Sequence, residues 1–158
     1  MEVDTNTILT DGLSMPHSPR WHQESLWVQE SGHGSLAKVD MMTGKRETVA
    51  MFPGLTRGLD FYGNFAFVGL SQVRETAVFS GLPLTERLEE RTCGIWIINL
   101  QTGKTIANLT FDVGVQEIFA VQILPGLRYP ELMPEGEEYV AHSYVLPDEA
   151  LKEVASLP

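Results

Sequence analysis

Cysteine is nearly absent from this chain of 158 residues, because Cys93 is the only one. A single thiol cannot form an intrachain disulfide, and it cannot supply the several thiolates of a structural zinc site. Long apolar runs are also missing, since no segment approaches the roughly 18 consecutive apolar residues of a membrane-spanning helix. The first residues lack the basic stretch and apolar run of a secretion signal. We therefore expect a cytoplasmic protein that has no membrane partner.

Basic residues are scarce as well. The 11 Lys and Arg residues are outnumbered by 21 Asp and Glu residues, which gives a formal net charge of -10 at pH 7. A nucleic-acid-binding protein needs clustered Lys and Arg to displace counterions from phosphates. We therefore expect no nucleic-acid partner, and we interpret the acidic surplus as solvated surface.

Helical periodicity is nearly absent, and short strand-like segments take its place. They are rich in β-branched and aromatic residues and are bounded by Gly, Pro, Asn or Asp. The turns at 43–45 and 102–104 read Thr-Gly-Lys, which suits hairpins because Gly tolerates positive φ. One short helix is expected within 82–92. The expected strands are 25–31, 35–40, 46–52, 58–62, 65–71, 93–100, 105–111, 116–124 and 138–146.

An internal repeat organises these segments. Residues 18–31 match residues 58–71 at an offset of 40, and residues 35–45 match residues 94–104 at an offset of 59. The difference, 59 − 40 = 19 residues, is an insertion after Ser71. A unit of about 40 residues with four strands has the size of a β-propeller blade. The sequence thus predicts an all-β fold, a partial β-propeller of about two and a half four-stranded blades, with the short helix in the inserted loop.

The predicted organisation is a single propeller-like domain over residues 1–158. Its repeat units are 16–55, 56–114 with the insertion 72–93, a partial unit 115–146, and a tail 147–158.

Closed propellers typically need four or more blades, so the predicted blades cannot close a ring alone. An open array would expose one blade face and its strand edges. We therefore expect self-association, most simply a twofold dimer that closes a five- or six-bladed ring. The alternative is an irregular open β-sandwich.

Several stretches resemble a known family when they are taken together. They resemble the C-terminal half of a family of uncharacterised bacterial conserved hypothetical proteins, which is β-propeller-like and has no established function. The resemblance implies a fold and leaves the activity open. The N-terminal half of that family has no counterpart here, so a second copy would have to supply any site shared between the halves. The matching stretches are LSMPHSPRWH, LWVQESGHGSL, FPGLTRGLDFYGNFAFVGLSQVRET, FSGLPLTERLEERTCGIWIINLQTGK and GVQEIFAVQILPGLRYPE.

Polar residues recur at the start of the predicted innermost strands, which line the channel in a propeller. The repeat aligns His17 with Arg57, and Arg57 with Gln116, and Glu117 follows directly. Together these four residues would offer donors and one carboxylate to a small polar ligand. The alternative is that they satisfy backbone groups at strand ends and hold channel waters.

The insertion is the second candidate region, because loops on a rigid scaffold often carry function. Arg74 and Glu75 begin it, and Phe79 and Leu82 could anchor it as a lid or as a contact with a partner. The alternative is a surface excursion.

No catalytic constellation stands out. A nucleophile-elbow pattern is absent, and the histidine spacing does not form a metal site. Trp21 and Trp27 are expected in the core, where their repeat partners are phenylalanines. The leading hypothesis is thus a non-catalytic binding and assembly module without cofactor or metal. It would associate with a second copy of itself, and it would bind a small molecule or a protein partner at the channel. The alternative is a propeller-type hydrolase or lactonase that uses His17, Arg57 and Glu117 in a polar or metal-containing channel site.

Overall fold

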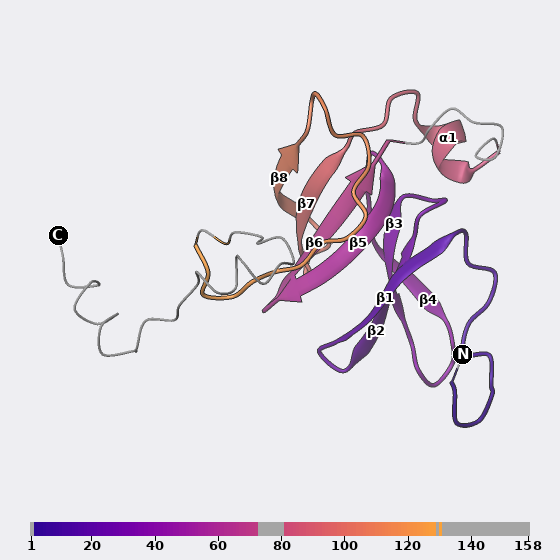
Figure 1. The fold of residues 1–158 in the computed structure, drawn as a ribbon. Helices are drawn as coiled ribbons and strands as arrows, with labels where there is room; N and C mark the ends of the chain where they lie inside the picture. The colour runs from indigo at the N-terminus through magenta and orange to yellow at the C-terminus, as the bar shows by residue number, and fades with distance from the viewer. Residues whose placement is uncertain (1, 73–80, 129, 131–158) are drawn as a thin grey trace, which may run out of the picture. The chain divides into compact units, whose positions relative to one another are not determined.

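The computed structural model describes residues 2–72, 81–128 and 130. In this part of the chain the regular structure consists of eight strands and one short helix, which confirms the all-β prediction (Figure 1). By its internal contacts the chain divides into two units, residues 1–123 and residues 124–158. All eight strands and the helix belong to the first unit. No helix within the described residues is long and apolar enough to cross a membrane.

The strands form two four-stranded antiparallel sheets, each an up-and-down meander in chain order. The first sheet contains β1 (Pro16–His22), β2 (Ser25–Glu30), β3 (Ser35–Val39) and β4 (Arg46–Met51). The second contains β5 (Leu55–Tyr62), β6 (Phe65–Ser71), β7 (Gly94–Asn99) and β8 (Thr105–Thr110).

The pairing register repeats from one sheet to the other. Leu26 pairs with Val39 in the first sheet, and Ala66 pairs with Ile98 in the second. These pairs are related by the offsets of 40 and 59 found in the sequence. The two Thr-Gly-Lys turns are also built alike, because a side-chain oxygen of the residue before each turn accepts backbone N–H bonds. Asp40 does so before the first turn, and Asn99 before the second.

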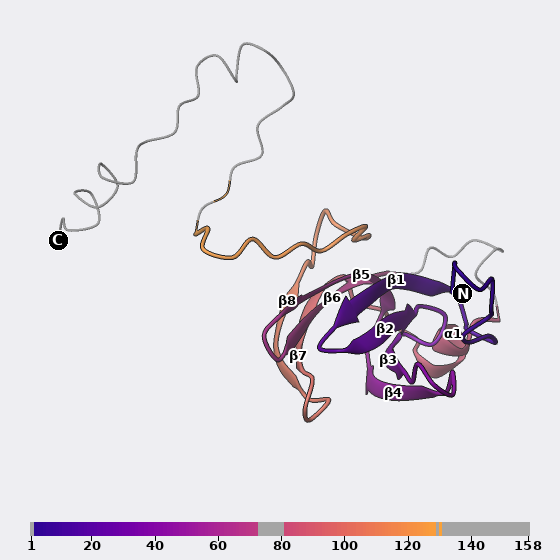
Figure 2. The ribbon, with the colours of Figure 1, turned by 90° about the horizontal axis from the view of Figure 1, so that it is seen from below.

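The main core lies between the two sheets, which pack through one face of each. Strands β1 and β5, which are the first strands of the two sheets, lie side by side (Figures 1 and 2). The Phe61 ring stacks on His22 at 4.3 Å between centroids, and it meets Trp27 at 5.7 Å with a tilt of 52°. The buried members of this core are Trp27, Leu36, Ala50, Phe52, Leu59, Ala66, Val68, Leu70, Trp96 and Ile98.

A buried polar bridge also joins the sheets. The Gln29 side chain of β2 is fully buried, and its Nε2 donates a hydrogen bond of 2.8 Å to the Gly58 carbonyl of β5. Main-chain groups that face each other across a sheet interface need such partners, because an unpaired buried carbonyl costs free energy.

The prediction for the tryptophans is half right. Trp27 is in the core, but Trp21 is 61% exposed. Its repeat partner Phe61 is covered by the first sheet. Trp21 pairs with Leu26, which packs in the cluster on the face of the first sheet that points away from the second. The burial of this repeat position therefore depends on a preceding sheet, and residues 2–14 cover only part of that face.

Two other expectations need correction. Residues 116–124 were expected as a strand, but no strand is assigned there within the described residues. A strand needs a hydrogen-bonded neighbour, and the expected strand 138–146 lies outside the described part of the chain. The expected helix within 82–92 is shorter than predicted and spans α1 (Pro83–Arg87).

The helix α1 fastens the insertion to one end of both sheets. Leu84 is fully buried and packs with Leu55 at the start of β5. The Leu84 N–H donates to the Gly32 carbonyl over 2.9 Å. Arg87 donates to the Phe52 carbonyl over 2.9 Å, so the insertion is tied to the β2–β3 turn and to the connection between β4 and β5.

Candidate functional site

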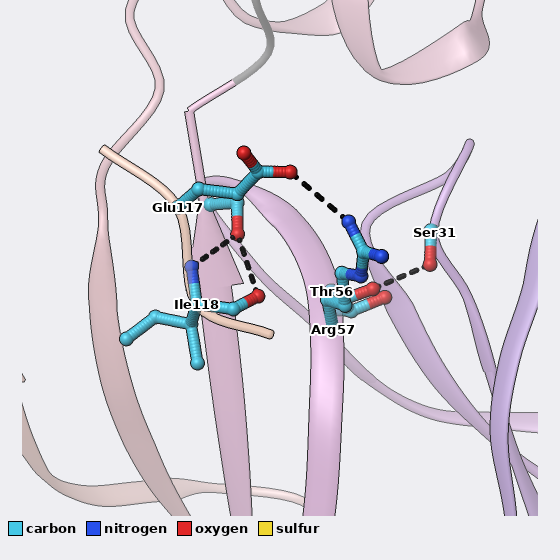
Figure 3. Close-up of polar contacts among 6 residues, drawn as sticks. Ser31, Thr56, Arg57, Glu117 and Ile118 are labelled. Carbon is cyan, nitrogen blue, oxygen red and sulfur yellow. Dashed lines mark hydrogen bonds and ion pairs between the residues drawn. The ribbon is translucent and has the colours of Figure 1, made fainter. Parts of the chain in front are cut away.

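Three of the four predicted ligand residues come together near the start of β1 and β5. Arg57, near the start of β5, donates a hydrogen bond of 3.0 Å to the Glu117 carboxylate (Figure 3). Both side chains are partly exposed, 26% for Arg57 and 44% for Glu117. An ion pair this accessible to water contributes at most about 1 kcal/mol to stability, so its position matters more than its strength.

His17 belongs to the same cluster. It lies near the start of β1 and is half-buried. Burial, and after it the positive charge of Arg57, lower the pKa of His17 below its usual value of 6.5. A lowered pKa favours the neutral imidazole, which offers one donor and one acceptor rather than a second positive charge.

An aromatic ring missed in the sequence completes the cluster. The Arg57 guanidinium lies over the Phe119 ring, 4.4 Å from its centroid, and this ring is 77% exposed. Gln116 is exposed. Its backbone carbonyl accepts a hydrogen bond of 2.9 Å from the Gln72 N–H, which holds the residue in place. The structure thus brings His17, Arg57 and Glu117 together, while the Gln116 side chain makes no contact among the described residues that ties it to them.

Two serine hydroxyls hold the start of β5 and the segment around Ile118, and their partners correct the repeat alignment made from the sequence. The Ser31 hydroxyl donates to the Thr56 carbonyl, and the Ser71 hydroxyl, 40 residues later, donates to the Ile118 carbonyl over 3.2 Å. Figure 3 shows the first of these bonds, and it labels Ile118 with the dashed hydrogen bonds at its backbone. Ile118 therefore takes the place of Thr56 at an offset of 118 − 56 = 62, not 59.

In this register Phe119, not Gln116, is the counterpart of Arg57. The sequence does match Ser31 with Ser71 in the repeat. It does not show which carbonyl each hydroxyl bonds, so the shift of three residues in the alignment could not be predicted. Phe119 was hidden because it fell inside a segment expected to be a strand.

The one thiol near this cluster is not poised for nucleophilic attack. Cys93 is fully buried. Burial, and after it the negative charge of Glu117, raise the pKa of the Cys93 thiol above 9.0. A protonated thiol is a poor nucleophile, so the arrangement around Cys93 suits packing and not covalent catalysis.

Metal binding finds no ligand set in the described part of the chain. Within residues 2–72, 81–128 and 130, no group of three or more His, Cys, Asp or Glu side chains gathers closely enough to hold an ion.

The predicted lid residues divide between described and undescribed parts of the chain. Arg74, Glu75 and Phe79 lie outside the described residues. Leu82 is half-buried and packs in a small cluster with Leu84 of α1, while a role for it in a lid or a partner contact stays a prediction.

Comparison with known proteins agrees with the resemblance seen in the sequence. No curated protein matches the chain. A family model described as a domain of unknown function (DUF4915) matches residues 1–133, a range that contains both sheets, α1 and the cluster around Arg57. This chain therefore belongs to the DUF4915 family.

Proposed function

We propose that this chain is a non-catalytic binding and assembly module of the β-propeller type. It closes a ring with a second copy and holds a small carboxylate ligand beside Arg57. The observation that carries the proposal is the polar cluster at the start of two adjacent innermost strands. In propellers this is where the channel opens and where ligands bind.

The assembly half of the proposal rests on the far face of the second sheet. Phe67 pairs with Ile97, and Ile95 pairs with Leu109, so these four apolar side chains share the face that points away from the first sheet. Leu109 is 55% exposed, and the other three are half-buried. Contiguous apolar faces of this kind are unusual on a monomer and are typical of interaction surfaces.

The ligand half rests on the donors of Arg57. A guanidinium carries five N–H donors in a planar fork that matches a carboxylate in bidentate geometry. Among the described contacts of Arg57, only its bond to Glu117 uses such a donor. A ligand carboxylate would compete with Glu117 for the fork, while its apolar body would lie against Phe119. Neutral His17 would supply one further hydrogen bond.

Isothermal titration calorimetry with benzoate and succinate as probes tests this site. Arg57→Gln should abolish binding, because it removes the charge and the fork. Glu117→Gln should strengthen binding by about tenfold or less, because it removes a competing carboxylate whose pairing is worth about 1 kcal/mol. Lys45→Gln is the matched control, since Lys45 lies in an exposed turn.

The opposite signs of the two variants make the test decisive. A carboxylate that binds equally well to wild type and to Arg57→Gln would contradict the proposed site. A metal-dependent hydrolase is less favoured, because within the described residues no group of three or more His, Cys, Asp or Glu side chains gathers to hold an ion, and the Cys93 thiol is buried.

A further inference from the structure

The N-terminal segment around Leu9 and Leu13 covers part of the first sheet. Leu9 and Leu13 pack on the far face of the first sheet, against Val28, Ala37 and Val39. The equivalent face of the second sheet carries Phe61, and that face packs against the first sheet. The segment therefore covers part of a surface that, in the second sheet, is covered by the first.

The repeat shows which element the segment replaces. A side chain at Gly103, in the turn between β7 and β8, would collide with the carbonyl of Val49 in β4. A side chain at Gly44, in the equivalent turn of the first sheet, would collide with the carbonyl of Leu9. Gly103 follows Gly44 by 59 residues and Val49 follows Leu9 by 40, which are the two repeat offsets. The contact of Leu9 with the Gly44 turn of the first sheet is thus equivalent to the contact of Val49 with the Gly103 turn of the second sheet. The segment around Leu9 therefore takes the position, relative to the first sheet, that the outermost strand β4 takes relative to the second.

The other end of the described unit shows the complementary feature. Residues 116–123 follow β5 as β5 follows β1, because the Ser71 hydroxyl holds Ile118 as the Ser31 hydroxyl holds Thr56. The Ile118 N–H also donates to the Ser71 hydroxyl over 2.8 Å. The segment therefore stands in the place of an innermost strand, yet no strand is assigned to it among the described residues.

We propose that residues 7–13 of one copy and residues 116–123 of a second copy are the outermost and innermost strands of one shared blade. This inference rests on the proposed ring closure and says how the ring closes. Each copy contributes two complete blades and one half of each of two shared blades, which is equivalent to three blades. A twofold ring therefore has 2 × 3 = 6 blades.

A second copy is required by the positions of the two segments. One lies on the far face of the first sheet, and the other on the far face of the second, so the two sheets separate them within one copy. Ile8 is 68% exposed next to inward-packed Leu9, as expected for a strand with a second face to bury.

Cross-linking between two tagged versions of the full chain tests the shared blade. One version carries Thr10→Cys and the other carries Gln122→Cys, and they are co-expressed and purified through both tags. Outermost and innermost strands of one blade are three strand spacings apart, about 14 Å, so a bis-maleimide that spans roughly 15–20 Å should link them. Buried Cys93 should not react, and the wild-type chain is the control for it.

The expected product has twice the mass of one chain. It should form between a Thr10→Cys chain and a Gln122→Cys chain more readily than between two copies of the same variant. A second test uses Ile8→Asp, which changes an exposed side chain and so should leave the fold of one copy intact. It should weaken self-association by tenfold or more, since a charge would be buried at the shared blade. Met42→Asp, at a site 93% exposed in a turn, should leave it unchanged.

The outcomes separate the two proposals. A dimer without preferential linking, and insensitive to Ile8→Asp, would overturn the shared blade and leave ring closure standing. A chain that stays at 17.6 kDa at every concentration would overturn ring closure, and the shared blade with it.

Discussion

The packing of residues 116–123 on β5 can be tested by adding one methyl group at Gly58. Gly58 has a φ of 81°, and a Cβ there would lie 2.8 Å from the Val121 nitrogen and 2.9 Å from the Ala120 carbonyl carbon. Both atoms are backbone, so neither can rotate away. Gly58→Ala should therefore disturb this segment directly.

The cost has two parts that can be separated by a control. Placing alanine in the left-handed region costs about 1–2 kcal/mol. Overpacking against backbone adds about 1–3 kcal/mol. Gly63 has a φ of 56°, and a Cβ there would meet nothing within 4 Å, so Gly63→Ala carries the first cost alone. The free energy of unfolding should fall by about 2–5 kcal/mol for Gly58→Ala and by about 1–2 kcal/mol for Gly63→Ala.

Urea unfolding followed by tryptophan fluorescence measures both variants under identical conditions. Equal losses of stability would refute the reasoning, because they would mean that residues 116–123 do not lie against β5. The position of Phe119 beside Arg57 would then lose its basis as well.

Other predictions follow from the same packing and charges. Because the pKa of His17 is lowered, the unfolded chain binds that proton more readily, so the free energy of unfolding should fall as the pH drops below 6.5. His17→Gln should flatten this decline, and NMR titration of Arg57→Gln should show a raised pKa for His17; an unchanged pKa would contradict their proximity. The Cys93 thiol, whose pKa is raised, should react with iodoacetamide at pH 8 far more slowly than in urea, and equal rates would show that it is not buried. Leu84→Ala should cost about 2–5 kcal/mol in urea unfolding, because Leu84 is fully buried, whereas Leu82→Ala at a half-buried site should cost less. A reversed order would mean that α1 is not fastened as described.

The strands and hairpins could be predicted from the sequence because their signals are local. Alternating apolar residues and Gly-containing turns specify a strand within about six residues, and seven of the nine expected strands are present. The two-sheet repeat could be predicted as well, since Trp27 and Phe67 occupy matched positions whose neighbours also match.

What failed depends on contacts between distant segments. Trp21 looks like a core residue in every local respect, and only the lack of a complete sheet on its side leaves it exposed. Phe119 comes beside Arg57 through the hydrogen bonds of Ser71, which no spacing rule reveals. The N-terminal segment around Leu9 has a repeat partner in β4, but the match is too weak to find without the Gly44 contact.

The most direct test of ring closure is the absolute mass of the full chain in solution. Light scattering on a sizing column, over a tenfold range of concentration, reports it without assumptions about shape. We expect a concentration-independent mass of twice 17.6 kDa. A single-chain mass of 17.6 kDa across that range would contradict ring closure.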